Sequence, residues 1–142
     1  TVLHVDEAAG MAYYAHVGDS RLYLLRRGVF RQVSRDHSYV EELVARGELS
    51  EAEAQHHPRK NVLLRAVGIE ERLHVDGDSF PLEVGDRLLL ATDGLTNMVD
   101  DDVLAALLGG DFANVAERMV EQALAGGGSD NITAIALAYE MP

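Results

Sequence analysis

Three aspartates are the residues of this sequence whose surroundings best suit chemistry. Asp19 lies in a Gly-Asp-Ser tripeptide, Asp93 in Thr-Asp-Gly and Asp130 in Ser-Asp-Asn, and each adjoins an apolar segment. Strand ends project side chains into a shared cleft, and small neighbours let an ion approach a carboxylate closely. Carboxylates gathered in this way repel one another unless cations lie between them. Hard oxygen ligands suit Mg²⁺ or Mn²⁺, and two such ions about 3.5–4 Å apart can clamp a phosphoryl group for hydrolysis.

A turn-forming role explains each of these aspartates taken singly. Asp before Gly or Ser commonly accepts a hydrogen bond from its own backbone two residues on. Three such residues beside strands favour metal binding and phosphate-ester hydrolysis, but their spacing by itself leaves both interpretations open.

Composition bounds the protein that must position these carboxylates. A chain of 142 residues with 47% hydrophobic and 25% charged residues is one globular domain, long enough to bury about 68–70% of its unfolded surface. The net charge of −12 disfavours nucleic-acid phosphates and anionic lipid as partners. No apolar run approaches the roughly 20 residues of a membrane span. The absence of cysteine excludes disulfides and thiolate chemistry, and it favours the cytoplasm.

Hydrophobic periodicity predicts a mixture of antiparallel strands and short helices. The expected strands are residues 11–17, 21–26, 29–33, 73–75, 86–92 and 132–139, of which 86–92 is apolar enough to be central. The expected helices begin at Ser38 and at the capping box of Ser50 and Glu53, and cover residues 100–108 and 112–123. Residues 62–67 are ambiguous between strand and helix, and residues 76–78 are expected to form a loop.

Six short motifs follow one another in an order typical of a known family. They are residues 15–23 (Ala-His-Val-Gly-Asp-Ser-Arg-Leu-Tyr), 36–38 (Asp-His-Ser), 57–58 (His-Pro), 64–68 (Leu-Arg-Ala-Val-Gly), 91–95 (Ala-Thr-Asp-Gly-Leu) and 129–133 (Ser-Asp-Asn-Ile-Thr). Together they resemble the bacterial branch of the PPM, or type-2C, metal-dependent protein serine/threonine phosphatases.

The resemblance implies an α+β fold, a four-layer α/β/β/α sandwich of antiparallel sheets flanked by helices. Residues 1–142 would form a single, partial phosphatase catalytic domain, the C-terminal part of that sandwich. Residues 37–60 correspond in position to the family's flap, a helical excursion beside the active site linked to substrate choice. A solvated helical hairpin with no role in recognition is the alternative for this segment.

Motif matching also implies roles for individual residues. Asp93 and Asp130 would bind two core Mn²⁺ or Mg²⁺ ions and act in catalysis through a metal-activated water. Asp19 would share a third, weaker ion with Asp93. Asn131 would orient the ligands without binding metal itself.

The family's upstream motifs are missing from this sequence, among them the Asp-Gly-x-Gly-Gly segment whose aspartate bridges the core metals. Residues 6–10 are too unlike that segment to replace it and are expected to form a hairpin turn. We therefore expect the chain alone to be weakly active or inactive, and its edge strands to need the missing N-terminal segment or a partner.

The reaction that the resemblance implies is hydrolysis of phosphoserine and phosphothreonine on proteins, with phosphoprotein substrates and a serine/threonine kinase as the counterpart. A phosphatase-like regulatory or binding module without activity is the main alternative. Cation buffering by an acidic surface is a third, and it predicts weak binding spread over many carboxylates.

Overall fold

Residues 1–140 are described by a computed structural model, in which two antiparallel sheets and five helices make an α+β fold. The first sheet has the strand order β1-β2-β5, and the second has the order β4-β3-β6-β7. The strands are β1 (Val2–Asp6), β2 (Met11–His16), β3 (Arg21–Arg26), β4 (Val29–Gln32), β5 (Asp76–Pro81), β6 (Arg87–Ala91) and β7 (Ala134–Ala138). The helices are α1 (Tyr39–Ala45), α2 (Glu51–His56), α3 (Asp93–Thr96), α4 (Asp101–Gly109) and α5 (Val115–Ala125).

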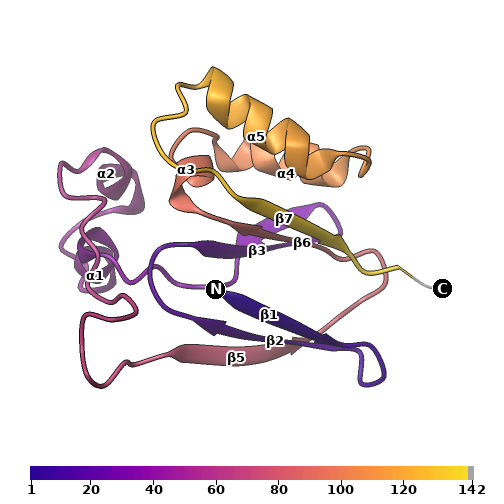
Figure 1. Cartoon of the computed structure of the whole chain (residues 1–142), viewed down its shortest axis with the longest axis horizontal. Coiled ribbons are helices and arrows are strands. Elements are labelled where there is room, and N and C mark those ends of the chain that lie inside the picture. Colours follow the sequence, from indigo (N-terminus) through magenta and orange to yellow (C-terminus); the bar gives the residue numbers. More distant parts are fainter. Residues whose placement is uncertain (141–142) are drawn as a thin grey trace.

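The two sheets lie one above the other, and α3, α4 and α5 cover the outer face of the larger sheet (Figure 1). The pair α1 and α2 stands beside one end of the sandwich (Figure 1). Within residues 1–140, none of the helices combines the length and the hydropathy that a bilayer crossing needs. The described residues thus build two sheets and one helical layer, which are three layers of the four-layer α+β sandwich expected from the sequence.

Strands β3 and β6 are buried on both faces because one face meets the helices and the other meets the smaller sheet. Along β3, Leu22 and Leu24 point into the core between the sheets, whereas Tyr23 points into the core beneath the helices. Strand β6 divides its side chains in the same way, with Leu88 between the sheets and Leu89 beneath the helices. Side chains alternate across a strand, so burial on both faces demands the nearly continuous apolar run seen in the sequence.

Local signals in the sequence set the ends of several helices. The Ser38 hydroxyl accepts a hydrogen bond from the Glu41 N–H at the start of α1, and Gly47 follows this helix with a φ of +73°. At the start of α2, Ser50 and Glu53 form the predicted capping box, each accepting from the other's backbone N–H. Both helix starts are confirmed, because a hydroxyl that satisfies a free N–H group acts locally.

The predictions for residues 62–78 are wrong in two places. Residues 73–75 lie outside any strand, and residues 76–78, expected to form a loop, begin strand β5. Strand β5 is an edge strand whose residues are all exposed except Phe80, and it lacks the apolar run by which a strand is recognised. Residues 62–67 form neither a helix nor a strand, apart from an isolated bridge between Leu63 and Ser38.

Substitutions in helix α5 test the packing of the core beneath the helices. Met119 is fully buried on α5, whereas Leu124 of the same helix is 58% exposed. We expect Met119→Ala to lower the free energy of unfolding by about 2–5 kcal/mol, because it removes buried methylene groups and leaves a cavity. The matched Leu124→Ala change should stay within about 0.5 kcal/mol. Denaturant unfolding of both variants measures the difference, and equal losses would contradict this packing.

Candidate metal centre

The register of three neighbouring strands brings the predicted site residues to one end of the larger sheet. Arg21 of β3 pairs with Ala91 of β6, and Asp19 precedes the first of these residues by two positions while Asp93 follows the second by two. Because β3 and β6 are antiparallel, a residue just before one strand lies beside a residue just after the other. The Gly-Asp-Ser turn and the Thr-Asp-Gly segment therefore meet at the same edge.

The segment that carries Asp130 is attached to the same edge through hydrogen bonds to Thr92. The Thr92 N–H donates to the Thr133 carbonyl oxygen (3.1 Å), and the Thr133 N–H donates to the Thr92 Oγ1 (2.9 Å). Asp130 lies just upstream, where its Oδ1 accepts a hydrogen bond from the Asn131 N–H (2.7 Å). The loop before β7 is thus held against the start of α3, where Asp93 is the first helical residue.

Gly94 allows this close contact. A Cβ atom at Gly94 would lie only 2.2 Å from the backbone carbonyl oxygen of Asn131, which no side chain tolerates. The same carbonyl oxygen accepts a hydrogen bond from the Thr92 hydroxyl (3.3 Å). Asn131 thus packs through its backbone against the helix that bears Asp93, and the ligand-orienting role predicted for it stays a prediction.

The pKa of Asp19 shows that neighbouring carboxylates act on it. Burial raises the pKa of Asp19 above its usual value, and the negative charges of Asp93 and Asp36 raise it further. Within residues 1–140, no arginine, lysine or histidine forms an ion pair with Asp19, Asp93 or Asp130. A half-buried carboxylate repelled by its neighbours and unpaired with a cationic side chain suits a bound cation.

The carboxylate oxygens are the type of ligand that a hard divalent ion prefers, but too few of them come together among the described residues to bind one by themselves. Among residues 1–140, no three His, Asp or Glu side chains come close enough together to form a metal site. Carboxylates from outside these residues, or water, would have to complete the coordination that Mg²⁺ or Mn²⁺ prefers. The roles assigned to Asp19, Asp93 and Asp130 as ligands remain predictions.

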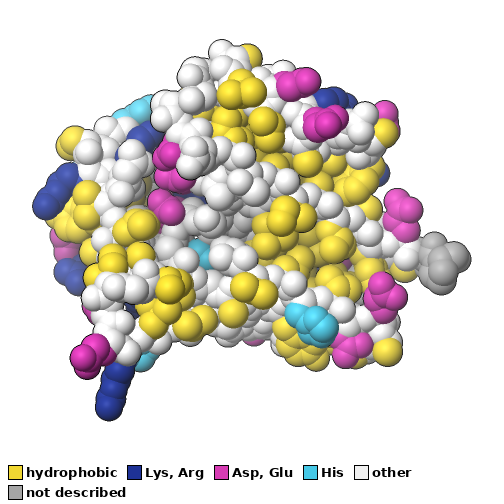
Figure 2. Space-filling model, in the orientation of Figure 1, with side chains coloured by type: hydrophobic (Ala, Val, Ile, Leu, Met, Phe, Trp, Pro, Cys, Tyr) yellow, Lys and Arg dark blue, Asp and Glu magenta, His cyan; other side chains and the backbone are white. Residues whose placement is uncertain are grey.

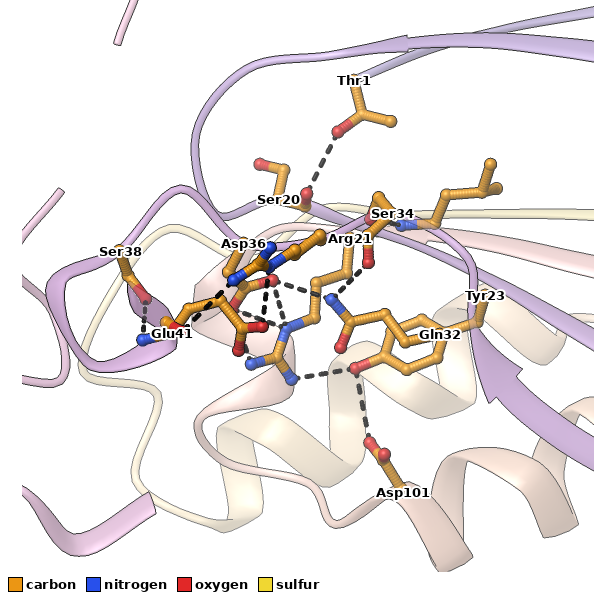
Figure 3. Close-up of polar contacts among 12 residues, drawn as sticks. Thr1, Ser20, Arg21, Tyr23, Gln32, Ser34, Asp36, Ser38, Glu41 and Asp101 are labelled. Atoms are coloured by element: carbon orange, nitrogen blue, oxygen red, sulfur yellow. Dashed lines mark hydrogen bonds and ion pairs between the residues drawn. The ribbon is translucent and has the colours of Figure 1, made fainter. Parts of the chain in front are cut away.

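A partly buried ion pair supports the Gly-Asp-Ser turn from below (Figure 3). The Arg21 guanidinium donates to both Asp36 oxygens, with an Nη2–Oδ2 distance of 2.8 Å, and to the Tyr23 hydroxyl at 3.0 Å. Burial alone would lower the pKa of Arg21, but the hydrogen bond to Asp36 raises it above its usual value. Burial raises the pKa of Tyr23 to about 12, so its neutral hydroxyl donates to Asp101 of α4. This network links the turn to the helical layer.

Sequence reasoning assigned Asp36 no role in this network. Residues 36–38 stood out only as a family motif, and the strand pattern gave no sign that Asp36 would lie beneath Arg21. The available signal was the pairing of an arginine that opens a buried strand with an isolated aspartate, because a guanidinium at such a depth needs a counter-charge.

Comparison with known proteins decides the family of the chain. No protein-family model matches it. It is 42% identical over 137 residues to the serine/threonine phosphatase stp of Listeria monocytogenes, covering 95% of this chain and 54% of the relative. The solved structure of the Mycobacterium tuberculosis serine/threonine phosphatase PstP/Ppp superposes with a TM-score of 0.91 at 34% identity, covering 98% of this chain and 58% of that one. The chain belongs to the bacterial branch of the PPM serine/threonine phosphatase family.

This PPM chain spans about half the length of the curated relatives it matches. A further solved structure, the catalytic domain of PstP in complex with two manganese ions, matches at a TM-score of 0.80 and 33% identity, with 94% of this chain and 55% of that one covered. The family resemblance inferred from the six motifs and the α+β sandwich are both confirmed. That the chain corresponds to the C-terminal part of the domain stays a prediction.

Gly94 provides a test of the contact between the segments that carry Asp93 and Asp130. We expect Gly94→Ala to lower the free energy of unfolding by about 1–3 kcal/mol, because its Cβ would overlap the Asn131 carbonyl and force the segments apart. The matched control is Gly109→Ala at the end of α4, where the new Cβ would meet only a flexible leucine methyl group at 3.3 Å. That change should stay within about 1 kcal/mol. Equal denaturation midpoints for the two variants would exclude the proposed steric role.

Charge repulsion at Asp19 provides a second test. In buffer with a metal chelator, we expect Asp19→Asn to stabilise the chain by less than about 1 kcal/mol, because it removes repulsion among half-buried, partly screened charges. The control, Asp78→Asn, alters an exposed carboxylate of β5 and should change little. Thermal unfolding in the chelator measures both, and a clear loss of stability in the Asp19 variant would show that its charge is compensated.

Proposed function

We propose that this chain forms part of a Mn²⁺- or Mg²⁺-dependent phosphatase that hydrolyses phosphoserine and phosphothreonine on proteins. The observation that carries the proposal is the convergence of three predicted ligand segments, carrying Asp19, Asp93 and Asp130, at one end of strands β3, β6 and β7. The relatives are serine/threonine phosphatases, which supports the same reaction class.

Each aspartate has a distinct role in this proposal. Asp93 and Asp130 bind the two core ions, and the match to a relative solved with two manganese ions supports this assignment. Asp19 binds a third, weaker ion together with Asp93, whose charge already acts on it. Bound divalent ions would supply an activated water and neutralise the phosphoryl oxygens. Gly94 and Asn131 keep the two ligand segments in contact through their backbones.

Residues 37–60 form the flap in this proposal and contact the phosphoprotein. They contain α1 and α2, which stand beside the sandwich instead of packing on a sheet face (Figure 1). Segments that are positioned by a rigid scaffold near a site often carry recognition. The solvated-hairpin alternative predicts that exchanging these residues leaves substrate preference unchanged.

A further polypeptide segment completes the fold in this proposal. Strands β1 and β7 are edge strands of their sheets. Both lie on the near side of the sandwich in Figure 1, and hydrophobic side chains gather on that surface (Figure 2). Leu3, Val5 and Leu137 are only partly buried there, and Ile135 is 57% exposed. Unpaired strand edges with apolar neighbours favour the addition of strands. We assign this side to the N-terminal segment that carries the family's remaining metal ligands.

The cellular setting follows from the family and the composition. We propose that the protein acts in the cytoplasm, because a chain without cysteine suits a reducing compartment. The family resemblance implies a serine/threonine kinase as its counterpart.

The main alternative is a phosphatase-like regulatory module without activity. The observation that favours it is the lack of three converging metal-binding side chains within residues 1–140. The two functions differ in whether turnover appears once the missing ligands are supplied.

Hydrolysis of p-nitrophenyl phosphate and of a phosphothreonine peptide in Mn²⁺ tests the proposal. We expect weak or no turnover by the chain alone and clear turnover when the upstream half of the family domain is joined to it. Asp93→Asn in the joined form should lower kcat by more than the roughly 10–100-fold typical of residues outside the coordination sphere. Asp102→Asn, an exposed carboxylate in the first turn of α4, is the control and should leave kcat unchanged. A folded, joined form without turnover would favour the regulatory module.

A further inference from the structure

The residue before Asp19 is held on both sides by a single histidine. The backbone N–H of His37 donates to the Gly18 carbonyl oxygen (2.8 Å), and the backbone N–H of Gly18 donates to the ring nitrogen Nδ1 of His37 (3.2 Å). An amide N–H can only donate, so Nδ1 must be the unprotonated nitrogen and Nε2 must carry the proton. The imidazole is 6% exposed, and the ring of the buried His16 lies 4.9 Å from it between centroids. The His37 ring therefore has one orientation.

The protonated nitrogen of His37 points away from the turn, toward strand β5. Nε2 donates to the Asp76 Oδ2 at 2.8 Å, and the other Asp76 oxygen accepts from the Arg65 Nη1 at 3.0 Å. The hydrogen bond from His37 lowers the pKa of Asp76 below its usual value, and the charge of Arg65 lowers it further. Asp76 thus stays ionised and fixes which nitrogen of His37 holds the proton.

The far end of this set of contacts reaches the surface. The Arg65 side chain is 43% exposed and borders a cavity of about 140 Å³ that Leu64, Ile69 and Leu73 also line. It also borders a smaller cavity of about 70 Å³ over His37 and Asp76. A chain of contacts thus connects that surface to the turn that carries Asp19, through Arg65, Asp76, His37 and Gly18.

We propose that His37 is a positioning residue that sets the place of the Asp19 carboxylate by accepting the Gly18 N–H at Nδ1, and that Asp76 keeps the ring proton on Nε2 so that Nδ1 is free to accept. The role rests on the proposed function in one respect, the assignment of Asp19 as a cation ligand. Asp36 holds Arg21 on the other side of the same turn, so neighbouring residues 36 and 37 fix the turn from both ends. A displacement at His37 would move Asp19 and leave Asp93 and Asp130 in place.

Two variants of His37 separate the two halves of its contacts. His37→Asn keeps an acceptor near the position of Nδ1 but is too short to reach Asp76. His37→Gln places a donor near the position of Nε2 but offers Gly18 no acceptor. His37→Ala removes both side-chain contacts. Arg46→Ala is the control, because within residues 1–140 the Arg46 side chain pairs with Glu42, one helical turn away on the surface.

The first measurement is NMR of the full chain without metal. We expect a neutral His37 with Nε2 protonated, and an exchange-protected Gly18 amide that exchanges at least about tenfold faster in His37→Gln and His37→Ala. His37→Asn and Arg46→Ala should retain this protection. A proton on Nδ1, or unchanged Gly18 exchange in His37→Gln, would overturn the proposal. The tautomer and the Gly18 exchange are read in the unaltered chain and in the Asn and Gln variants, so misfolding of the Ala variant does not affect the test.

The second measurement is Mn²⁺ affinity by electron paramagnetic resonance, which distinguishes positioning from structural support. In folded variants we expect about 10–100-fold weaker binding at the weakest site for His37→Gln and His37→Ala, and rescue to within about threefold for His37→Asn. Unchanged affinity after loss of Gly18 protection would overturn the positioning role. If the parent chain binds no Mn²⁺, the proposed metal function of the isolated chain fails, while the tautomer and the Gly18 exchange still decide the role of His37.

Discussion

The antiparallel pairing of β3 with β6 is the interaction on which the rest of this structure depends. Both strands are buried on both faces, and their register places Arg21 opposite Ala91. The segment before Arg21 and the segment after Ala91 therefore have to meet at one end of the sheet. A slip of one residue would exchange the two faces of β3, moving leucines and Tyr23 into the wrong layer. The core thus fixes the geometry of the candidate metal centre.

A buried carboxylate is paired with an arginine at one end of these two strands, whereas at the other end a half-buried carboxylate has no cationic partner within residues 1–140. At the end away from the candidate site, the carboxylate of Asp86 is 1% exposed and is neutralised by Arg26 at 2.6 Å, with a further hydrogen bond from the Glu83 N–H. At the site end, Asp19 lies near Asp93 without such a partner in residues 1–140. The first arrangement stabilises the fold, whereas the second leaves repulsion in place for a ligand to relieve. Functional sites commonly reduce stability in this way.

How much of the fold and of the candidate site could be predicted depended on whether each feature is caused by neighbouring residues or by distant ones. The capping box at Ser50 and the apolar strand β6 were predicted because hydrogen bonding over three residues and burial on both faces are written into short stretches of sequence. Strand β5 was missed because its pairing with β2, not its composition, makes it a strand. The contacts of His37 with Gly18 and Asp76 were missed for the same reason, since their partners lie 19 and 39 residues away in the chain.

The sequence by itself determined the family, the mixed α+β class and the three aspartates at the ends of apolar segments, because motif order, periodicity and turn chemistry are properties of neighbouring residues. Only the tertiary structure decided which of these groups meet. It placed Asp19 beside Asp93 through a strand register, pressed the Asn131 carbonyl against Gly94, and joined the turn at Gly18 to the surface through His37. Such contacts are set by packing between segments far apart in the chain, and no local pattern encodes them.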